Sequence, residues 1–146
     1  MDITIKRLCE NDRAAIIMMM TEFYNSPAVS TNGSEEIFNR DFDACISDNP
    51  YLEGYGIWDG ERLIGYGMTA KGFSTEFGKP CIWVEDIYIT GEYRGKRIGE
   101  VFFDYIERAY PHHIFRLEVS EDNERAIALY KRKGYEPLHY VELIKK

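Results

Sequence analysis

The sequence has fewer basic than acidic residues and has no long apolar run. It contains 18 Lys and Arg against 25 Asp and Glu, which gives a formal net charge of −7. Because nucleic-acid binding requires basic surface, no nucleic-acid partner is expected. The longest apolar run, Ala14 to Met20, has seven residues, whereas a membrane-spanning helix needs about 20. We therefore expect no membrane span and no membrane partner.

Cysteine is scarce, and the N-terminus lacks the pattern of a secretory signal. Cys9, Cys45 and Cys81 are odd in number and far apart, which disfavours a disulfide framework and a zinc site. We expect all three to be small core residues, and we expect no metal site. The first residues, MDITIKR, contain no basic stretch followed by an apolar core, so the expected location is cytoplasmic.

Length and composition are those of an ordinary globular protein. A chain of 146 residues lies within the usual size of one compact domain and can bury most of its apolar surface without staples. Apolar residues make up 45% and charged residues 29%, which argues against a disordered or fibrous protein. We predict a single domain over residues 1–146.

Apolar residues recur with strand and helix periods along the chain. Ile3 and Ile5 alternate with polar residues, as in a half-buried strand, and Ile98 to Ala109 is strongly amphipathic at helical spacing. The other expected helices run from about residue 12 to 24, around 37–46 and after 123, and the other expected strands are 55–58, 63–70, 81–89, 115–119 and 139–144. The order βααβββαβαβ predicts a mixed sheet covered by helices.

A basic loop precedes the amphipathic helix. Arg94, Lys96 and Arg97 fall within four positions of an otherwise acidic chain, and Gly95 and Gly99 allow close approach of the backbone. Backbone N–H groups converge at a helix N-terminus, so this unit is suited to a polyanion such as a pyrophosphate. The segment lacks GxGxxG and follows a sheet meander, which disfavours a Rossmann dinucleotide site.

The same segment resembles a known phosphate-binding signature. EYRGKRIGEVFF, Glu92 to Phe103, is similar to the Arg/Gln-x-x-Gly-x-Gly/Ala motif of the GNAT N-acetyltransferase superfamily, with Arg94, Arg97 and Gly99 in the first, fourth and last places. The family usually has glycine where this chain has Arg97. An arginine there either weakens coenzyme binding or grips a phosphate with its side chain.

A second segment resembles the same superfamily. EVSEDNERAIALYKRKGYE, Glu118 to Glu136, is similar to the family's strand, its NxxAxxLYxxxGF helix and the strand that follows. Two motifs at family spacing make a specific signal. The positions that match the second motif are Asn123, Ala126, Leu129, Tyr130, Gly134 and Tyr135.

The resemblance implies a fold and a co-substrate. The fold would be α+β, with a mixed, mostly antiparallel central sheet of six to seven strands and about four helices packed on both faces. The co-substrate would be acetyl-CoA, with the backbone of the strand 81–89 holding its pantetheine arm. The implied coenzyme-binding residues are Ile87, Tyr88, Ile89, Arg94, Gly95, Lys96, Arg97, Ile98, Gly99, Glu100, Asn123 and Tyr130.

Two side chains are the catalytic candidates. The resemblance places the phenol of Tyr130 beside the coenzyme sulfur, where it would donate a proton to the departing thiolate; the alternative is simple aromatic packing. Glu85 is the candidate base, and it requires burial or a bridging water because a glutamate is ordinarily a weak base. Asp86 competes with it, since a β-bulge would upset the strict alternation of faces. Asn123 either orients coenzyme or caps its helix.

The acceptor is the least defined part. Phe73 to Ile89 is similar to the matching segment of the spermidine/spermine and thialysine acetyltransferase branch, which favours a small primary amine or polyamine that attacks the thioester directly. Alternatives are acetylation of a protein or peptide amine, and a non-catalytic CoA-binding sensor. The C-terminal residues 140–144 would supply an edge for a homodimer, or would be covered within one chain. Four further residues could line the acceptor pocket or equally be core or surface residues, and they are Glu22, Tyr24, Tyr66 and Trp83.

Overall fold

The computed structural model describes all 146 residues. One five-stranded sheet has the order β1-β2-β3-β4-β5, and its strands are β1 (Ile3–Arg7), β2 (Leu52–Asp59), β3 (Arg62–Ser74), β4 (Lys79–Ile89) and β5 (Ile114–Leu117). The first four strands are antiparallel to their neighbours, and β5 is parallel to β4. The helices are α1 (Arg13–Tyr24), α2 (Glu35–Ile46), α3 (Ile98–Ala109) and α4 (Glu124–Arg132).

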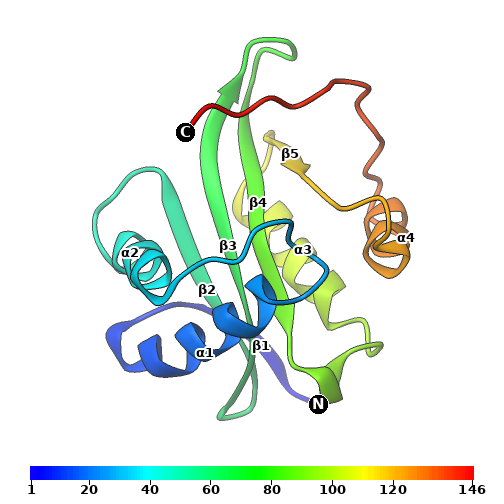
Figure 1. The fold of residues 1–146 in the computed structure, drawn as a ribbon. Helices are drawn as coiled ribbons and strands as arrows, with labels where there is room; N and C mark the ends of the chain where they lie inside the picture. Colours follow the sequence, from blue (N-terminus) through cyan, green and yellow to red (C-terminus); the bar gives the residue numbers. More distant parts are fainter.

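The predicted α+β architecture with four helices is confirmed. One apolar cluster joins α1 and α2 to one face of the sheet, and a second joins α3 to the opposite face, with α4 beside it (Figure 1). Gly67 of β3 allows α3 to approach closely, since a Cβ there would lie 2.3 Å from Cζ of Phe102. No helix combines the length and the apolar character needed to cross a bilayer.

The prediction of six to seven strands is wrong, because the sheet has five. The strand expected at 139–144 does not form, and residues 135–146 carry no helix or strand. The Tyr140 hydroxyl instead donates to Glu76 Oε2 at 2.5 Å, which holds this segment across the β3–β4 hairpin (Figure 1). A strand-forming pattern does not by itself specify a pairing partner, and this segment does not pair with the outer edge of β5. The most exposed apolar residues of the segment are Tyr140, Val141, Leu143 and Ile144, at 69%, 86%, 88% and 82%.

The expected burial of the cysteines holds for two of the three. Cys45 and Cys81 are buried, whereas Cys9 is exposed. Cys9 precedes a single 3-10 turn, and its backbone N–H donates to Asp12 Oδ2 at 2.9 Å. The position is therefore part of a surface turn rather than of the core.

Glu53 ties several elements together. Its Oε2 accepts hydrogen bonds from Arg7 Nη1 at 2.9 Å and from the Tyr55 hydroxyl at 2.8 Å, and its Oε1 is bonded by Lys71 and Tyr110. Burial disfavours the charged carboxylate, but these donors outweigh it and lower the pKa of Glu53 to about 2. Glu53 is thus a buried ion-pair centre that joins β1, β2, β3 and the end of α3.

The register between β3 and β4 shifts at one residue. Met68 pairs with Asp86 and Thr69 pairs with Val84, so Glu85 has no partner on β3. This is a β-bulge, which changes the face of the residues that follow it. Val84 packs with α3, whereas Asp86 reaches the last residue of α1 on the opposite face. The β-bulge that was one possibility for this strand from its sequence is therefore present.

Strands β4 and β5 separate immediately beside this bulge. Their parallel pairing covers only Cys81–Val84 with Ile114–Leu117. From Glu85 onward, the edge of β4 that faces β5 is therefore unpaired. This divergence opens the sheet between α3, α4 and the end of α1.

Candidate functional site

A cavity of about 380 Å³ occupies the space where β4 and β5 part. It is lined by both strands, by the loop before α3, and by α3, α4 and the end of α1. Two of the predicted site residues, Tyr88 and Lys96, do not line the cavity. The side chain of Tyr88 packs in the core beneath α1, and Lys96 Nζ lies 5.2 Å from the centre of the Tyr93 ring. The predicted site residues that line the cavity are Glu85, Ile87, Ile89, Arg94, Gly95, Arg97, Ile98, Gly99, Glu100, Asn123 and Tyr130.

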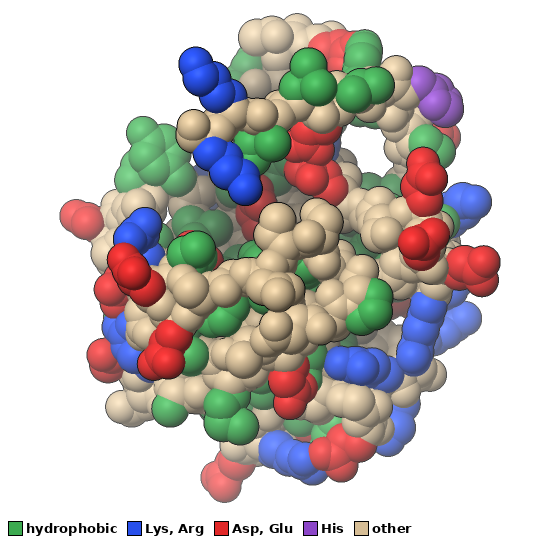
Figure 2. All heavy atoms as spheres, in the orientation of Figure 1, with side chains coloured by type: hydrophobic (Ala, Val, Ile, Leu, Met, Phe, Trp, Pro, Cys, Tyr) green, Lys and Arg blue, Asp and Glu red, His purple; other side chains and the backbone are tan.

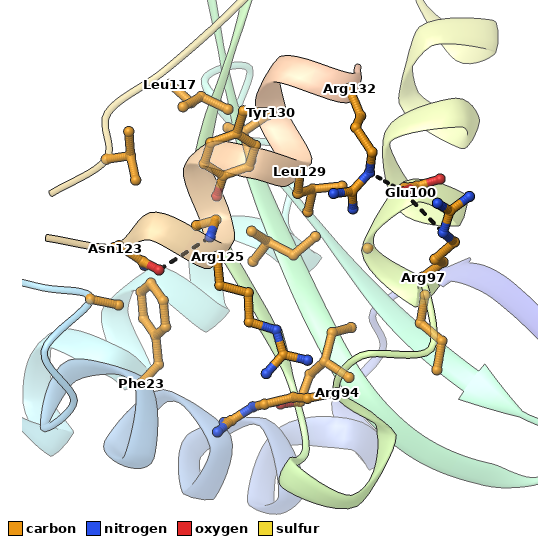
Figure 3. Close-up of a pocket in the computed structure, with 18 of the residues that line it drawn as sticks. Phe23, Arg94, Arg97, Glu100, Leu117, Asn123, Arg125, Leu129, Tyr130 and Arg132 are labelled. Carbon is orange, nitrogen blue, oxygen red and sulfur yellow. Dashed lines mark hydrogen bonds and ion pairs between the residues drawn. The ribbon is translucent and has the colours of Figure 1, made fainter. Parts of the chain in front are cut away.

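One end of the cavity is basic. Arg94 Nε donates to the Ile89 carbonyl oxygen at 2.8 Å, which holds the guanidinium over the cavity floor. Gly95 adopts φ 79°, and a Cβ there would lie 2.9 Å from Nη2 of Arg125. Glycine favours this left-handed backbone, and the guanidinium of Arg125 lies close to it. In Figure 3 the Arg94 and Arg125 side chains lie next to each other.

Arg97 takes the conformation that glycine favours. It has φ 61° and ψ 23° and stands at the N-cap of α3 with no side-chain cap. The first N–H groups of α3 are thus without a capping side chain, which suits an anion. Arg97 Nε lies 3.9 Å from Glu100 Oε1, which also accepts from Arg132 Nε at 3.0 Å (Figure 3). Glu100 therefore holds two guanidinium groups at this end.

Half of the 22 lining residues, 11 in all, were not among the predicted site residues, and four of these are of particular interest. Arg125 and Arg132 are seven positions apart on α4, so they share one helix face and both line the cavity. That spacing was a readable signal, because two basic residues on one face of the motif helix point to an anion. Phe23 and Ala28 also line the cavity, but they are distant in sequence and no local pattern marked them.

Tyr130 lies on the cavity side of α4. Its ring packs edge-to-face on Phe103, with centroids 5.6 Å apart, and is tilted against Tyr135 at 6.0 Å. Burial raises the pKa of Tyr130, so the phenol keeps its proton at neutral pH. Figure 3 shows the hydroxyl directed into the open space toward Asn123. Packing and access to the cavity therefore coexist at this residue.

Asn123 has a visible structural role. Its Oδ1 accepts from the backbone N–H of Ala126 at 3.2 Å, and it occupies the N-cap of α4. It also lines the cavity. The capping use is present in the structure, while contact with coenzyme stays a prediction.

Glu85 and Asp86 occupy different environments. Glu85 lines the cavity, and burial together with the charges of Glu142 and Asp41 raises its pKa. Asp86 is only 4% exposed and does not line the cavity. Burial raises the pKa of Asp86 to about 6, against the opposing effect of hydrogen bonds from two tyrosines.

The remaining candidates from the sequence lie outside the cavity lining. Tyr24 and Tyr66 donate their hydroxyls to the two oxygens of Asp86, at 2.9 and 2.8 Å. Glu22 accepts from the Tyr88 hydroxyl. Trp83 lies beneath Arg116, whose guanidinium carbon is 4.6 Å from the ring centre. These side chains surround the site without facing it.

The second end of the cavity is acidic. Glu118, after β5, lines the cavity with Glu85. Burial and the neighbouring Glu142 raise the pKa of Glu118. Glu142 belongs to the C-terminal segment, and Figure 2 shows acidic side chains in the hollow beneath that segment. One cavity therefore joins an arginine-rich end to a carboxylate-rich end.

Known proteins are similar in sequence to this chain over most of its length. Thialysine N-epsilon-acetyltransferase of Sus scrofa is 31% identical over 153 residues, which span 96% of this chain and 88% of that protein. The Bos taurus protein of the same name is 30% identical over 151 residues, with 96% and 88% covered. Both relatives thus cover nearly the whole chain.

Solved structures share the fold at low identity. A possible acetyltransferase from Clostridium difficile 630 superposes with a TM-score of 0.83 at 17% identity, covering 100% of this chain and 98% of that chain. The structure of AAC(6')-Iy in complex with the bisubstrate analog CoA-S-monomethyl-acetylneamine has a TM-score of 0.78 at 11% identity, covering 100% and 99%. The model of the Acetyltransferase (GNAT) family matches residues 17–135. The chain belongs to the acetyltransferase (GNAT) family.

Proposed function

We propose that the protein transfers the acetyl group of acetyl-CoA to a primary amine of a small cationic substrate, such as a polyamine or a lysine analogue. The observation that carries this proposal is the opposite charge at the two ends of one cavity. A polyphosphate fits the arginine-rich end, and an ammonium group fits the end formed by Glu85 and Glu118. The names of the thialysine acetyltransferase relatives support the same substrate class.

The residues at the basic end fit a coenzyme pyrophosphate. Arg94, Arg97 and Arg125 would bind phosphate oxygens, since guanidinium groups pair well with phosphate. The uncapped N-terminus of α3 adds backbone donors. Along β4, the edge from Glu85 onward has no strand partner on the β5 side. Apart from the Ile89 carbonyl, which accepts from Arg94, the backbone groups of this edge are available to the pantetheine amides. Acetyl-CoA would supply an acyl group activated as a thioester.

The reaction would proceed through Glu85, Glu118 and Tyr130. The substrate arrives as an ammonium ion, which attracts it to Glu85 and Glu118. The raised pKa of Glu85 makes it a better proton acceptor than a glutamate with an ordinary pKa, either directly or through water. The neutral amine then attacks the thioester carbonyl and forms the C–N bond, the C–S bond breaks, and the nitrogen loses its second proton to water, from which the Tyr130 phenol is later reprotonated. Tyr130, protonated and directed into the cavity, donates its proton to the departing thiolate.

The test is thiol release from acetyl-CoA with a panel of amines. We expect turnover with polyamines and lysine analogues and little with peptides, because the amine end of the cavity is carboxylate-lined. Turnover confined to peptides would favour a protein acetyltransferase instead. Measurable coenzyme binding without turnover on any amine would favour the sensor.

The C-terminal segment supports a proposal about assembly. Its apolar residues Val141, Leu143 and Ile144 are more than 80% exposed, and the outer edge of β5 has no strand partner. A second copy of the chain would cover both by pairing this segment with β5 as a sixth strand. Light scattering should give the mass of a dimer for the full chain and of a monomer after deletion of residues 138–146; a monomeric full chain contradicts the proposal.

A further inference from the structure

Phe23 brings the N-terminal part of the chain into the cavity. Phe23 and Ala28 are the two lining residues that precede β4 in the sequence. In Figure 3 the Phe23 ring rises from α1 toward Asn123, and the Tyr130 hydroxyl points into the same space. Phe23, Asn123 and Tyr130 line the same cavity, so the ring bounds that cavity from the side of α1.

Two hydrogen bonds fasten the last turn of α1 to β4. The Tyr88 hydroxyl on β4 donates to Glu22 Oε2 on α1. The Tyr24 hydroxyl on α1 donates to Asp86 Oδ1 on β4 at 2.9 Å. We call these two bonds the α1–β4 clamp. The residues that α1 contributes to it, Glu22 and Tyr24, are the immediate neighbours of Phe23.

Helix geometry turns the clamp into a constraint on Phe23. Successive helical residues are rotated by about 100° around the axis, so Glu22 and Tyr24 project to either side of Phe23. Bonds on both sides oppose rotation of the last turn. The ring also meets Tyr24 and Tyr66 edge-to-face, with centroids 5.2 and 6.4 Å apart. The direction of the Phe23 side chain is thereby fixed.

The bond to Asp86 is costly to break. Asp86 is 4% exposed, and its other oxygen accepts from the Tyr66 hydroxyl at 2.8 Å. A buried carboxylate that loses a donor is strongly disfavoured. Tyr24 is therefore held against β4, and Phe23 is held with it.

We propose that Phe23 sets the size of the acyl group that the site accepts, with Glu22, Tyr24, Asp86 and Tyr88 as positioning residues that fix its ring. This inference rests on the proposed acetyl transfer. The ring lies opposite the Tyr130 side of the cavity, and an acyl chain longer than acetyl needs the space that the ring fills.

The test compares kcat/KM for acetyl-, propionyl- and butyryl-CoA with one amine. The Phe23→Ala variant should raise the ratio of kcat/KM for butyryl-CoA to kcat/KM for acetyl-CoA by roughly tenfold or more. One methylene group in an apolar pocket typically changes specificity by that factor. The Tyr24→Phe and Tyr88→Phe variants keep their rings but lose one clamp bond each, so each should raise the ratio by a smaller factor. The matched control is Tyr55→Phe, which removes a tyrosine–carboxylate bond at Glu53 and should leave the ratio unchanged.

The outcomes separate the two parts of the inference. A wild-type ratio in folded Phe23→Ala overturns the role of the ring. A changed ratio in Phe23→Ala with wild-type ratios in both clamp variants overturns the positioning role of the clamp.

Calorimetric titration with acetyl-CoA and butyryl-CoA, without amine, should show the same change in preference between wild type and Phe23→Ala. If the wild type binds acetyl-CoA but acetylates no amine, the proposed function fails and the binding ratio alone decides the role of Phe23. If the wild type binds neither thioester, both proposals fail.

Discussion

The backbone of Arg97 makes a prediction about stability. Arg97 has φ 61° at the start of α3, in the left-handed region that costs a residue with a Cβ about 1–2 kcal/mol. The Arg97→Gly variant removes this cost. The greater conformational freedom of glycine in the unfolded chain opposes this gain and lowers the stability by about 0.4–1 kcal/mol. The Arg97 side chain is 73% exposed and 3.9 Å from Glu100, so its ion pair contributes little. We expect a net stabilisation of about 0.5–1 kcal/mol.

The Arg97→Ala variant separates the backbone from the side chain. Alanine keeps the left-handed cost and removes the guanidinium, so we expect it to be no more stable than wild type. Both variants should bind CoA about tenfold more weakly if the guanidinium contacts a phosphate, since a hydrogen bond to a charged group contributes about 1.5–3 kcal/mol. The weakening should diminish at high salt because charge attraction is screened.

Thermal unfolding and calorimetric titration with CoA measure the two effects. For a chain of this size, about 1 kcal/mol corresponds to a rise in Tm of roughly 2–4 °C. His112→Gly is the matched control, because His112 also has a positive φ, 66°, and lies outside the cavity lining. It should gain similar stability with unchanged CoA affinity. Equal stability of Arg97→Gly and Arg97→Ala would refute the backbone argument, and unchanged CoA affinity in both would refute the phosphate contact.

Three further predictions concern catalysis and folding. Tyr130→Phe should lower kcat by about 10²-fold with a smaller rise in KM, and an unchanged kcat in steady-state assays would remove Tyr130 from the acid role. Glu85→Gln should move the pH profile of kcat/KM upward, because more of the amine must then lose its proton without help; if Asp86→Asn does this instead, the base is Asp86. Glu53→Gln should lower the free energy of unfolding at pH 7 by about 2–3 kcal/mol. The pKa of this carboxyl is about 2 in the folded protein, so its charge stabilises the fold at pH values above the pKa of the unfolded state, and this contribution is lost as the pH falls toward 2. Urea titrations that show the same cost at pH 7 and near pH 2 would contradict this.

Local patterns in the sequence were enough to predict most of the elements. The amphipathic period of α3 and the alternation in β4 are set by which residues face the core, so both can be read from spacing. Most of the coenzyme-binding residues predicted from the two motifs line one cavity in the structure. Strand-like composition does not specify the pairing partner, and residues 139–144 form no strand although the outer edge of β5 is free.

Contacts between distant segments explain what the sequence left open. Nothing near Phe23 in the sequence indicates that α1 ends beside α4, because that placement depends on the hydrogen bond from Tyr24 to Asp86, 62 positions away. The environments of Glu85 and Asp86 depended equally on the bulge, which is a property of the pairing between β3 and β4. The alternation of faces along a strand cannot by itself predict where a bulge inserts an extra residue.

The bulge gives one short stretch three separate tasks. Val84 supports the core, Glu85 faces the cavity and Asp86 anchors α1. Since Glu85 has no ladder partner on β3, its side chain is exchangeable with little disturbance to the sheet on either side of it. The charge at the acceptor end can therefore be changed at this position, while the coenzyme half of the cavity and the folding core stay as they are.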